Sequence, residues 1–352
     1  MAIFRNGCRR AALARRRRMV KLKKTFRISG LKFLFKVEAS DDPADYAKYE
    51  RLRNDIWGFP EDNLPGTRNL MCENIFFDGS SLFIAIYREA GPGGFVEDDE
   101  HLIGFAYGFV GVKDKMVVFR RPDNLQFYAQ YTAVRDEYRG CGLGVRVKEF
   151  QRALVRDWFG VGTITCTFDP LTGVNAARNI HHFGMDVIDY KVATYGEFGG
   201  YLNRVDVPSD RLLMSWDLSK PPRKPGRAGR ESAFSPPQAL IRVREVTVAG
   251  RSGTLALERV DGLNPDGGGG RLAIPIPGDY YRMLRETDVD EPDVRRIPID
   301  WRLATRMLFQ RLFQKGYRVE DFVRPEDTRE KAYYVFVKDK PKRPLKSPRR
   351  PS

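Results

Sequence analysis

The sequence has few of the residues that build metal sites and disulfide frameworks. It contains four cysteines, Cys8, Cys72, Cys141 and Cys166, and three histidines in 352 residues. No two cysteines have the C-x-x-C spacing, and no histidine stands in metal-ligand register with them, so a zinc site and a disulfide framework are both poorly supported. The sequence therefore predicts no metal, and its cysteine usage fits a reducing compartment.

Long apolar runs are also absent. No stretch approaches the roughly 18–20 residues needed to span a bilayer. The Arg-rich start around Arg15–Arg18 lacks the apolar segment of a secretory signal. We therefore expect a cytoplasmic protein without membrane contact. A second methionine, Met19, would start a protein equally well, so the sequence leaves open whether residues 1–18 are translated.

Acidic residues are missing from both ends of the chain. Residues 1–30 hold eleven Lys and Arg and no acid, and residues 338–352 hold seven with one acid, Asp339. The formal net charge of +15 therefore comes from the ends, and the rest of the chain sums to −2. A basic folded face that binds nucleic acid is not favoured. We expect the ends to be solvated tails, with contacts to nucleic acid or lipid through them as the alternative.

What the sequence does contain is a glycine-rich turn between a strand pattern and a helix pattern. Residues 131–144 run Tyr-Thr-Ala-Val-Arg-Asp-Glu-Tyr-Arg-Gly-Cys-Gly-Leu-Gly. Three glycines in five positions let the backbone approach an anion, and free N–H groups at a helix start carry partial positive charge. The lysine-bearing P-loop and the dinucleotide fingerprint are both missing. The pattern predicts another kind of phosphate cradle, with a tight strand-to-helix connection as the alternative.

The helix after this turn is predicted by apolar residues at 147, 150, 154 and 158, with Lys148 away from that face. Strand patterns at 125–134 and 163–168 flank it in a βαβ unit, so these two strands should be parallel. An earlier helix starts at Asp42, its N-cap, and ends at Gly58. The other expected elements are strands at 33–39, 81–87, 102–110 and 211–218, with 81–87 and 102–110 antiparallel, and a short helix at 174–183. A mixed section begins at 185–190 and is closed by the strand at 211–218.

A proline-rich basic segment, residues 219–237, divides the chain. We expect a basic disordered leader at 1–29, a first domain at 30–218, this linker, a C-terminal α+β module at 238–340 and a basic tail at 341–352. The module holds a helix capped by Asp300 and ended by Gly316. Its expected strands lie at 240–248, 254–260, 272–277, 317–323 and 331–337, with residues 267–270 as a flexible connection.

The turn also carries a family resemblance. Arg139-x-x-Gly142-x-Gly144 is similar to the Q/R-x-x-G-x-G/A signature of the GCN5-related N-acyltransferases (GNAT), in a similar setting of strand, turn, amphipathic helix, strand and short helix. The resemblance implies an α/β (α+β) fold with a mixed central sheet splayed at the cofactor site. It also implies an N-acyltransferase that uses acyl-CoA as co-substrate. The residues implied to bind the pyrophosphate are Arg139, Gly140, Cys141, Gly142, Leu143 and Gly144, and those implied to bind the pantetheine are Thr132, Ala133 and Val134.

A narrower resemblance is to a bacterial subgroup of these enzymes with a C-terminal extension, some members of which are associated with N-acylamino-acid racemases. It rests on residues 138–144, 167–171, Asn175, Asn179, 301–306 and 316–319. This resemblance implies N-acylation of an amino acid. Acetyl-CoA is the default donor, and succinyl-CoA is the donor that the subgroup suggests.

The expected chemistry is direct attack of a neutral amine on the thioester, which requires an acid for the departing thiolate. Many family members carry a tyrosine where this chain has Ile180, so we predict that Tyr195 serves instead, with an ordinary half-buried tyrosine as the alternative. Asp169 is the candidate to anchor or deprotonate the substrate amine, and a turn residue before Pro170 is its alternative.

Four further residues are interpreted from the family pattern or from neighbouring residues. Asn175 is expected to contact the pantetheine or its sulfur, with a cap on its own helix as the alternative. Cys141 is expected to be a small residue beside the cofactor, because no histidine is positioned to make it a nucleophile. His181 and His182 point to different faces of a helix and are expected to be structural or surface residues.

Two other functions remain open at this point. One is acylation of a protein or peptide N-terminus, which calls for an open acidic groove. The other is a non-catalytic module that binds CoA, which the missing tyrosine at Ile180 favours. The sequence does not fix the oligomeric state, and a homodimer is one possibility.

Overall fold

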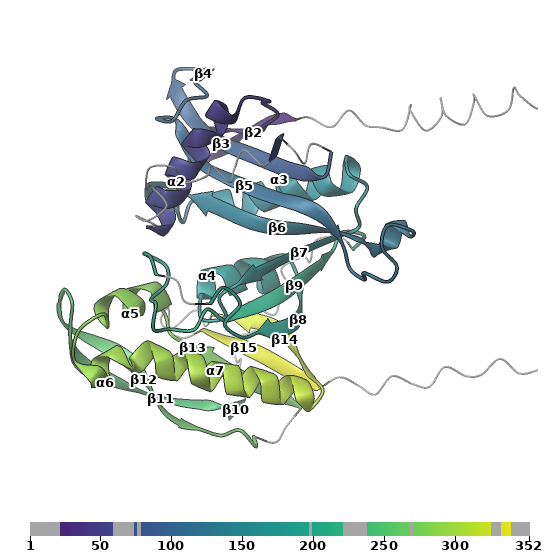
Figure 1. Cartoon of the computed structure of the whole chain (residues 1–352). Helices are drawn as coiled ribbons and strands as arrows, with labels where there is room; N and C mark the ends of the chain where they lie inside the picture. The colour runs from purple at the N-terminus through teal and green to yellow at the C-terminus, as the bar shows by residue number, and fades with distance from the viewer. Residues whose placement is uncertain are drawn as a thin grey trace, which may run out of the picture.

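The computed structural model describes residues 22–58, 74–75, 79–196, 199–220, 238–267, 270–324 and 332–338. Its first part is built on a nine-stranded sheet in the order β1-β2-β3-β5-β6-β7-β9-β8, with β4 paired to β3. All neighbouring strands are antiparallel except β6 and β7 (Figure 1). The strands are β1 (Lys23–Ile28), β2 (Leu31–Val37), β3 (Ser81–Gly91), β4 (Gly94–Phe95), β5 (Leu102–Val112), β6 (Leu125–Val134), β7 (Thr163–Phe168), β8 (Asp186–Lys191) and β9 (Arg211–Asp217).

Successive side chains of a strand point to opposite faces of the sheet, and apolar side chains lie on both faces. Each face therefore forms a hydrophobic core, and helices cover both. On one face, Phe35 of β2 packs against Phe150 with ring centroids 6.1 Å apart. On the other face, Phe83 of β3 lies 4.5 Å from the ring of Tyr49. The helical elements are η1 (Pro43–Tyr46), α2 (Ala47–Trp57), η4 (Pro122–Asn124), η5 (Asp136–Tyr138), α3 (Leu143–Asp157), α4 (Gly173–Ala176) and the π-helical η6 (Ala177–His182). The mixed sheet, the antiparallel β3–β5 pair and the parallel β6–β7 pair are as predicted.

The predicted helix limits at Asp42 and Gly58 are confirmed. The Asp42 side chain accepts a hydrogen bond from Ala44 N at 2.9 Å, and Gly58 ends α2 with a φ of +69°. The predicted leader is too long, because residues 23–28 form β1 and pair with β2 along their whole length. The apolar residues Phe26 and Ile28 are separated by the basic Arg27, which is the alternation typical of a strand. The high positive charge of this segment made that pattern easy to miss. Residues 1–21 lie outside the described residues.

Helix α3 departs from its predicted face at two positions. Trp158 follows the last helical residue and is 44% exposed, whereas Lys148 is only 4% exposed. The Arg178 side chain of η6 lies near Lys148 and against Gly144 of α3, so more of α3 is covered than the face on the sheet. The buried part of the helix is therefore wider than a single apolar stripe predicts.

The C-terminal module holds a four-stranded sheet in the order β10-β13-β15-β14 and the hairpin β11-β12. Helix α7 contacts both the hairpin and the sheet (Figure 1). It begins at Ile297, so Asp300 lies in its first turn and is not the predicted N-cap, while Gly316 follows it with a φ of +77° as expected. The elements are β10 (Gln238–Ala239), β11 (Ile241–Gly250), β12 (Gly253–Leu263), β13 (Arg271–Ile276), α5 (Tyr280–Glu286), α6 (Pro292–Arg295), α7 (Ile297–Gln314), β14 (Tyr317–Val323) and β15 (Ala332–Lys338).

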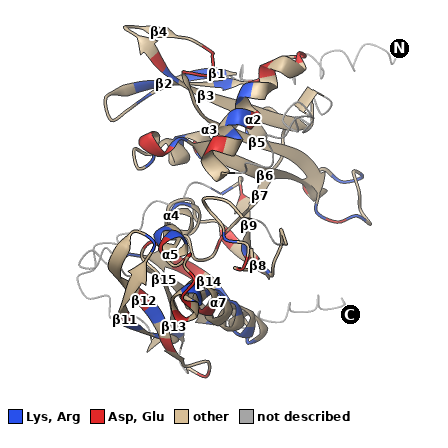
Figure 2. Ribbon diagram, turned by 60° about the vertical axis from the view of Figure 1, so that its left-hand side comes forward, with Lys and Arg blue, Asp and Glu red and all other residues tan. Residues whose placement is uncertain are grey.

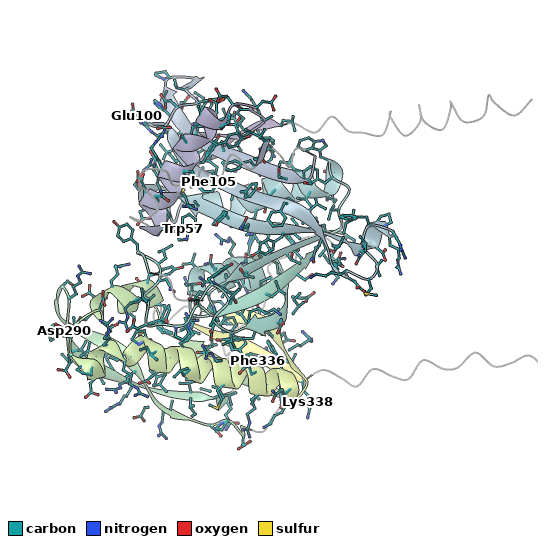
Figure 3. The ribbon with its side chains drawn as sticks, viewed as in Figure 1. Trp57, Glu100, Phe105, Asp290, Phe336 and Lys338 are labelled. Carbon is teal, nitrogen blue, oxygen red and sulfur yellow. The ribbon has the colours of Figure 1, made fainter. Side chains whose placement is uncertain are left out.

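The module and the first part share one hydrophobic core, which includes Phe150 and Phe336. The Tyr334 hydroxyl donates to the Pro170 carbonyl oxygen at 2.7 Å, so β15 is tied to the end of β7. Figure 3 marks Phe105 in the first part and Phe336 in the module. Residues 221–237 of the expected linker and the tail beyond 338 lie outside the described residues. Among the helices that are described, none has the length and apolar character to cross a membrane.

Candidate active site

Strands β6 and β7 separate soon after they meet. They pair only at Phe127 with Ile164 and at Tyr128 with Thr165. Beyond these positions β6 continues to Val134 on its other partner, β5, without further pairing to β7 in the described structure. A strand edge that loses its neighbour exposes backbone donors and acceptors. The sheet is therefore splayed at the predicted place, and the edge of β6 is open to a ligand.

Two glycines of β5 hold β6 in this position. A Cβ added at Gly104 would stand 2.5 Å from the Ala133 carbonyl oxygen, and one at Gly108 would stand 2.4 Å from that of Tyr128. The register between β5 and β6 shifts there, which leaves Gln130 as an extra residue. The predicted pantetheine-binding residues 132–134 lie on the part of β6 beyond this bulge.

The glycine turn joins the open end of β6 to α3. Gly140 and Gly142 have φ values of +80° and +97°, a backbone conformation that favours glycine. Within the described residues, the amides of residues 140–144 have no hydrogen-bond partner. These amides stand at the start of a 15-residue helix, where the helix dipole favours an anion. Arg139 is paired with Asp136 at 2.7 Å beside them.

A cleft of about 530 Å³ opens between the splayed strands. Of the predicted site residues, Thr132, Asp169, Asn175 and Tyr195 line it. The turn residues 139–144 are not among the lining residues. The turn is nevertheless adjacent, because Arg178 lines the cleft and its Nη1 lies 2.6 Å from where a Cβ of Gly144 would stand.

Asp169, at the end of β7, is buried and already holds two cations. Its Oδ1 and Oδ2 accept from Arg302 Nη1 and Nη2 at 2.9 and 2.5 Å, and Arg211 Nη1 lies 3.4 Å from Oδ2. Burial works to raise the pKa of Asp169, but the charge and hydrogen bonds of Arg302, with Arg211, hold that pKa below its usual value. Oδ1 also accepts from Leu171 N at 2.9 Å, as in the turn alternative. The carboxylate is therefore ionised and neutralised, and it clamps α7 to the cleft.

Tyr195 reaches the cleft from the loop after β8. Its hydroxyl lies 3.2 Å from Thr167 Oγ1 and its ring is 49% exposed. The Arg211 guanidinium stands 5.1 Å from the ring centroid, and the Tyr195 amide donates to Ser209 Oγ at 3.0 Å. Burial raises the pKa of the neighbouring Tyr128 to about 12. These contacts hold the Tyr195 phenol beside the end of β7, where the strands diverge.

Asn175 and Ile180 lie on the helical segment that follows β7. Asn175 donates to Thr172 Oγ1 at 3.1 Å and accepts from Arg178 Nη2 at 2.6 Å. The N-cap of α4 is Thr172 and no side chain bonds across it, so Asn175 does not cap its own helix. Ile180 is 2% exposed and packs in the apolar core, which leaves no hydroxyl at the usual family position.

The remaining sulfur and imidazole groups take part in local contacts. Cys141 Sγ donates to the Tyr138 carbonyl oxygen at 3.0 Å within the turn. His181 Nδ1 lies 3.1 Å from Asp321 Oδ1 of β14, and the His182 ring packs on Phe183 at 4.7 Å. Neither histidine lines the cleft.

Several cleft residues carry no signal in the sequence pattern. Lys148 comes from α3, Arg178 from η6, Arg211 from β9 and Tyr281 from α5 of the C-terminal module. Burial raises the pKa of Tyr281 to about 12. Each of these positions depends on tertiary packing, so no local spacing could have identified it. Together they make the cleft cationic, because its carboxylate, Asp169, is already neutralised.

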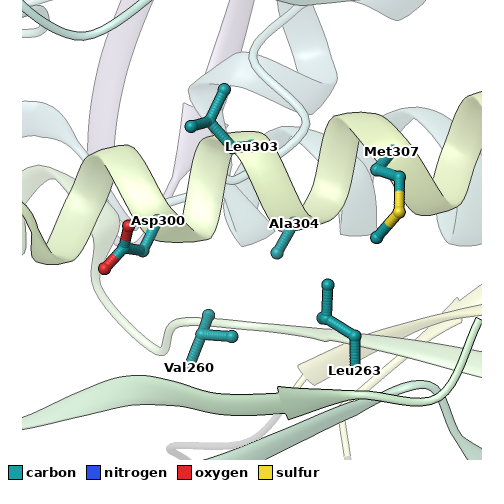
Figure 4. Close-up of a pocket in the computed structure, with 6 residues that line it drawn as sticks. All are labelled: Val260, Leu263, Asp300, Leu303, Ala304 and Met307. Atoms are coloured by element: carbon teal, nitrogen blue, oxygen red, sulfur yellow. The ribbon is translucent and has the colours of Figure 1, made fainter.

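A second pocket of about 310 Å³ lies between α7 and β12 (Figure 4). It is lined by four apolar side chains together with Ala304 and Asp300. It contains no open amide turn and no cation, so it lacks the groups that acyl transfer requires. Figure 2 shows Lys and Arg interspersed with Asp and Glu over both parts of the chain, without a single-sign face in that view.

No protein-family model and no curated protein matches this chain. Among solved structures, it is similar to Arabidopsis thaliana NAA60 in complex with a bisubstrate analogue, at 13% identity over 53% of this chain and 97% of that one, with a TM-score of 0.40. It is also similar to the ribosomal-protein-S5-alanine acetyltransferase of Vibrio fischeri, at 15% identity over 56% of this chain and 100% of that one, with a TM-score of 0.37. A third similar structure is a mutant of the spermidine/spermine N-acetyltransferase SpeG of Vibrio cholerae, at 12% identity over 53% of this chain and 96% of that one, with a TM-score of 0.36. The chain itself is a mixed α+β protein with one large mixed sheet.

Proposed function

We propose that this protein is an acyl-CoA-dependent N-acyltransferase of the GNAT type, acting on the amine of a small molecule or amino acid. The observation that carries the proposal is the set of open amides at residues 140–144, next to a cleft between splayed parallel strands. An open amide row at a helix start suits a pyrophosphate, and an unpaired strand edge suits the amides of a pantetheine arm.

Different residues would bind different parts of acyl-CoA. The amides from Gly140 to Gly144 and the Arg139 guanidinium would hold the pyrophosphate. The edge of β6 at residues 132–134 would pair with the pantetheine, and Asn175 would contact the arm near its sulfur. The fit is supported by the space above the turn: apart from the adjoining residues, no atom of the described part of the chain lies within 4 Å of a Cβ added at Gly140 or Gly142.

In the transfer step the amine nitrogen attacks the thioester carbonyl carbon, the carbon–sulfur bond breaks, and the thiolate takes a proton. We assign that proton to the Tyr195 hydroxyl. Asp169 is not suited to remove the proton from the amine, because Arg302 and Arg211 neutralise its carboxylate. Its proposed role is to hold Arg211 beside Tyr195. The amine must therefore enter neutral and release its proton to solvent.

The charge of the cleft bears on the acceptor. Lys148, Arg178 and Arg211 line it and repel an acceptor with several positive charges, such as a polyamine. An amino acid, whose carboxylate offsets its amine, suits this cleft better. The subgroup resemblance points to the same acceptor class and to succinyl-CoA beside acetyl-CoA as donor.

The test is thiol release from acetyl-CoA and succinyl-CoA against a panel of L- and D-amino acids. Gly142→Glu places a carboxylate in the turn and should abolish turnover. Gly160→Glu is the matched control, because Gly160 also has a positive φ, +69°, with open space around it, but lies at the other end of α3. Equal loss in both variants, or none in either, would contradict the role of the turn. CoA binding without turnover of any acceptor would favour the non-catalytic alternative.

A further inference from the structure

Lys148 is a buried cation without a partner. It lies on α3, is 4% exposed and lines the cleft. No described residue forms a hydrogen bond or ion pair with its ammonium group. Burial lowers the pKa of Lys148, as expected for a charge taken out of water. A buried charge without a counter-charge destabilises the folded protein. A perturbed cation that lines a cleft is a candidate contact for an anionic ligand.

Arg178 stands beside it on η6. Its Nη2 donates to Asn175 Oδ1 at 2.6 Å, but its Nε is buried and has no partner within the described structure. No described carboxylate lies within 4.0 Å of its guanidinium. Its Nη1 lies against Gly144, in the first turn of α3, where the helix dipole is positive and adds to the uncompensated charge.

The surroundings provide no counter-charge at this end of the cleft. Asp169 is the carboxylate among the described lining residues, and Arg302 and Arg211 hold it. The Cys166 side chain, which lies near both cations, carries a thiol and not a carboxylate. The buried Asn179 Oδ1, also unpartnered, is a neutral acceptor. Two cations therefore face the cavity with nothing to neutralise them.

We propose that Lys148 and Arg178 form a subsite for the carboxylate of a substrate that fills the cleft. A guanidinium and an ammonium side by side suit a small planar anion with two oxygens. The phosphates of the donor have their own place at the turn amides, so the anion at this subsite is a carboxylate. It belongs to the acyl group of a dicarboxylic acyl-CoA or to an amino-acid acceptor. The inference rests on the proposed function, since it names the substrate class of the same cleft.

The experiment compares matched ligands that differ only in the carboxylate. The donor arm measures the Kd and kcat/KM of succinyl-CoA against butyryl-CoA, which has a methyl group at the same position. The acceptor arm measures kcat/KM for an amino acid against its amide, with acetyl-CoA as donor. Hydrogen bonds to charged groups predict a preference of about ten- to a hundredfold for the carboxylate ligand in one arm. Lys148→Met should abolish that preference, and Arg178→Met should weaken it.

Arg156→Met is the control, because Arg156 is an exposed cation on the same helix, paired with Asp157 at 2.7 Å. It should leave the preference unchanged. Lys148→Met should also raise the Tm of the ligand-free protein, because it removes an unpaired buried charge. A lower Tm would mean that the ammonium is paired in solution and would overturn the inference.

The outcomes separate this inference from the proposed function. If the protein turns over butyryl-CoA as well as succinyl-CoA and the amide as well as the amino acid, the subsite is refuted and the acyltransferase stands. If it binds no CoA thioester at all, the proposed function fails and the subsite falls with it. If Lys148→Met still prefers the carboxylate ligand over its uncharged analogue, other residues bind the carboxylate and the subsite is refuted.

Discussion

Replacing Asp169 by asparagine should reduce the stability of the protein far more than a surface carboxylate would. The carboxylate is 4% exposed and its partner Arg302 is fully buried. Both carboxylate oxygens accept from the guanidinium, at 2.9 and 2.5 Å. Removing one member of a buried ion pair leaves the other charge uncompensated, which destabilises a protein by about 3–5 kcal/mol. We expect a loss of that size for Asp169→Asn and for Arg302→Met.

Combining the Asp169 and Arg302 substitutions in one protein tests the ion pair more specifically than either substitution alone. With both charges gone, the fully buried guanidinium charge disappears and only the more exposed Arg211 loses its carboxylate, so Asp169→Asn with Arg302→Met should be more stable than Asp169→Asn alone. The assay is urea unfolding followed by tryptophan fluorescence, analysed as a double-mutant cycle. The control is Asp261→Asn, whose partner Arg242 is 75% exposed and which should cost at most about 1 kcal/mol.

The same pair predicts a pH dependence. Because the pKa of Asp169 is lowered in the folded state, its contribution is present above the unfolded value of about 3.9 and is lost as the pH falls through the folded value. The acid-induced loss of stability should therefore be shallower in Asp169→Asn. The clamp is refuted if Asp169→Asn keeps its stability and loses only turnover, which would restore a catalytic role for this carboxylate.

Two further predictions concern the phenol and the open strand edge. Tyr195→Phe should lower kcat by about a hundredfold or more, as expected on loss of a general acid, with the KM for acyl-CoA and the Tm unchanged; a loss below threefold in steady-state thiol release would assign the proton to another group. Gly104→Ala should destabilise the protein by about 1–3 kcal/mol and weaken CoA binding in calorimetry, because its Cβ would stand 2.5 Å from the Ala133 carbonyl oxygen. Gly111→Ala on the same strand, with open space around it, should do neither.

The parts of the fold that the sequence predicts are those with local causes. The glycine turn follows from three glycines before an amphipathic run, and the parallel pairing of β6 with β7 follows from the βαβ order. The start of η1, the helical turn that leads into α2, follows from Asp42, whose side chain accepts a hydrogen bond from the amide two residues on. In each case the residues that determine the structure are neighbours in the chain.

The rest depends on contacts between distant residues. Arg302 reaches Asp169 across 133 positions, and no spacing rule links the two. Lys148 fits the polar side of a helical pattern, yet it is 4% exposed and lies near Arg178 and Cys166, which are distant in the sequence. Tyr281 joins the cleft through α5, a short helix that was not predicted. The glycine turn could thus be predicted from the sequence, whereas the charge of the cleft and the contribution of the C-terminal module to its lining could not.

CoA should bind to the open amides at the start of α3, and hydrogen–deuterium exchange tests this binding most directly. On addition of CoA, exchange in peptides covering residues 139–146 should slow by tenfold or more, while exchange in the β11–β12 hairpin turn, residues 250–253, should not change. Binding of CoA that leaves the amides of residues 140–144 unprotected would contradict the claim, as would the absence of any CoA binding.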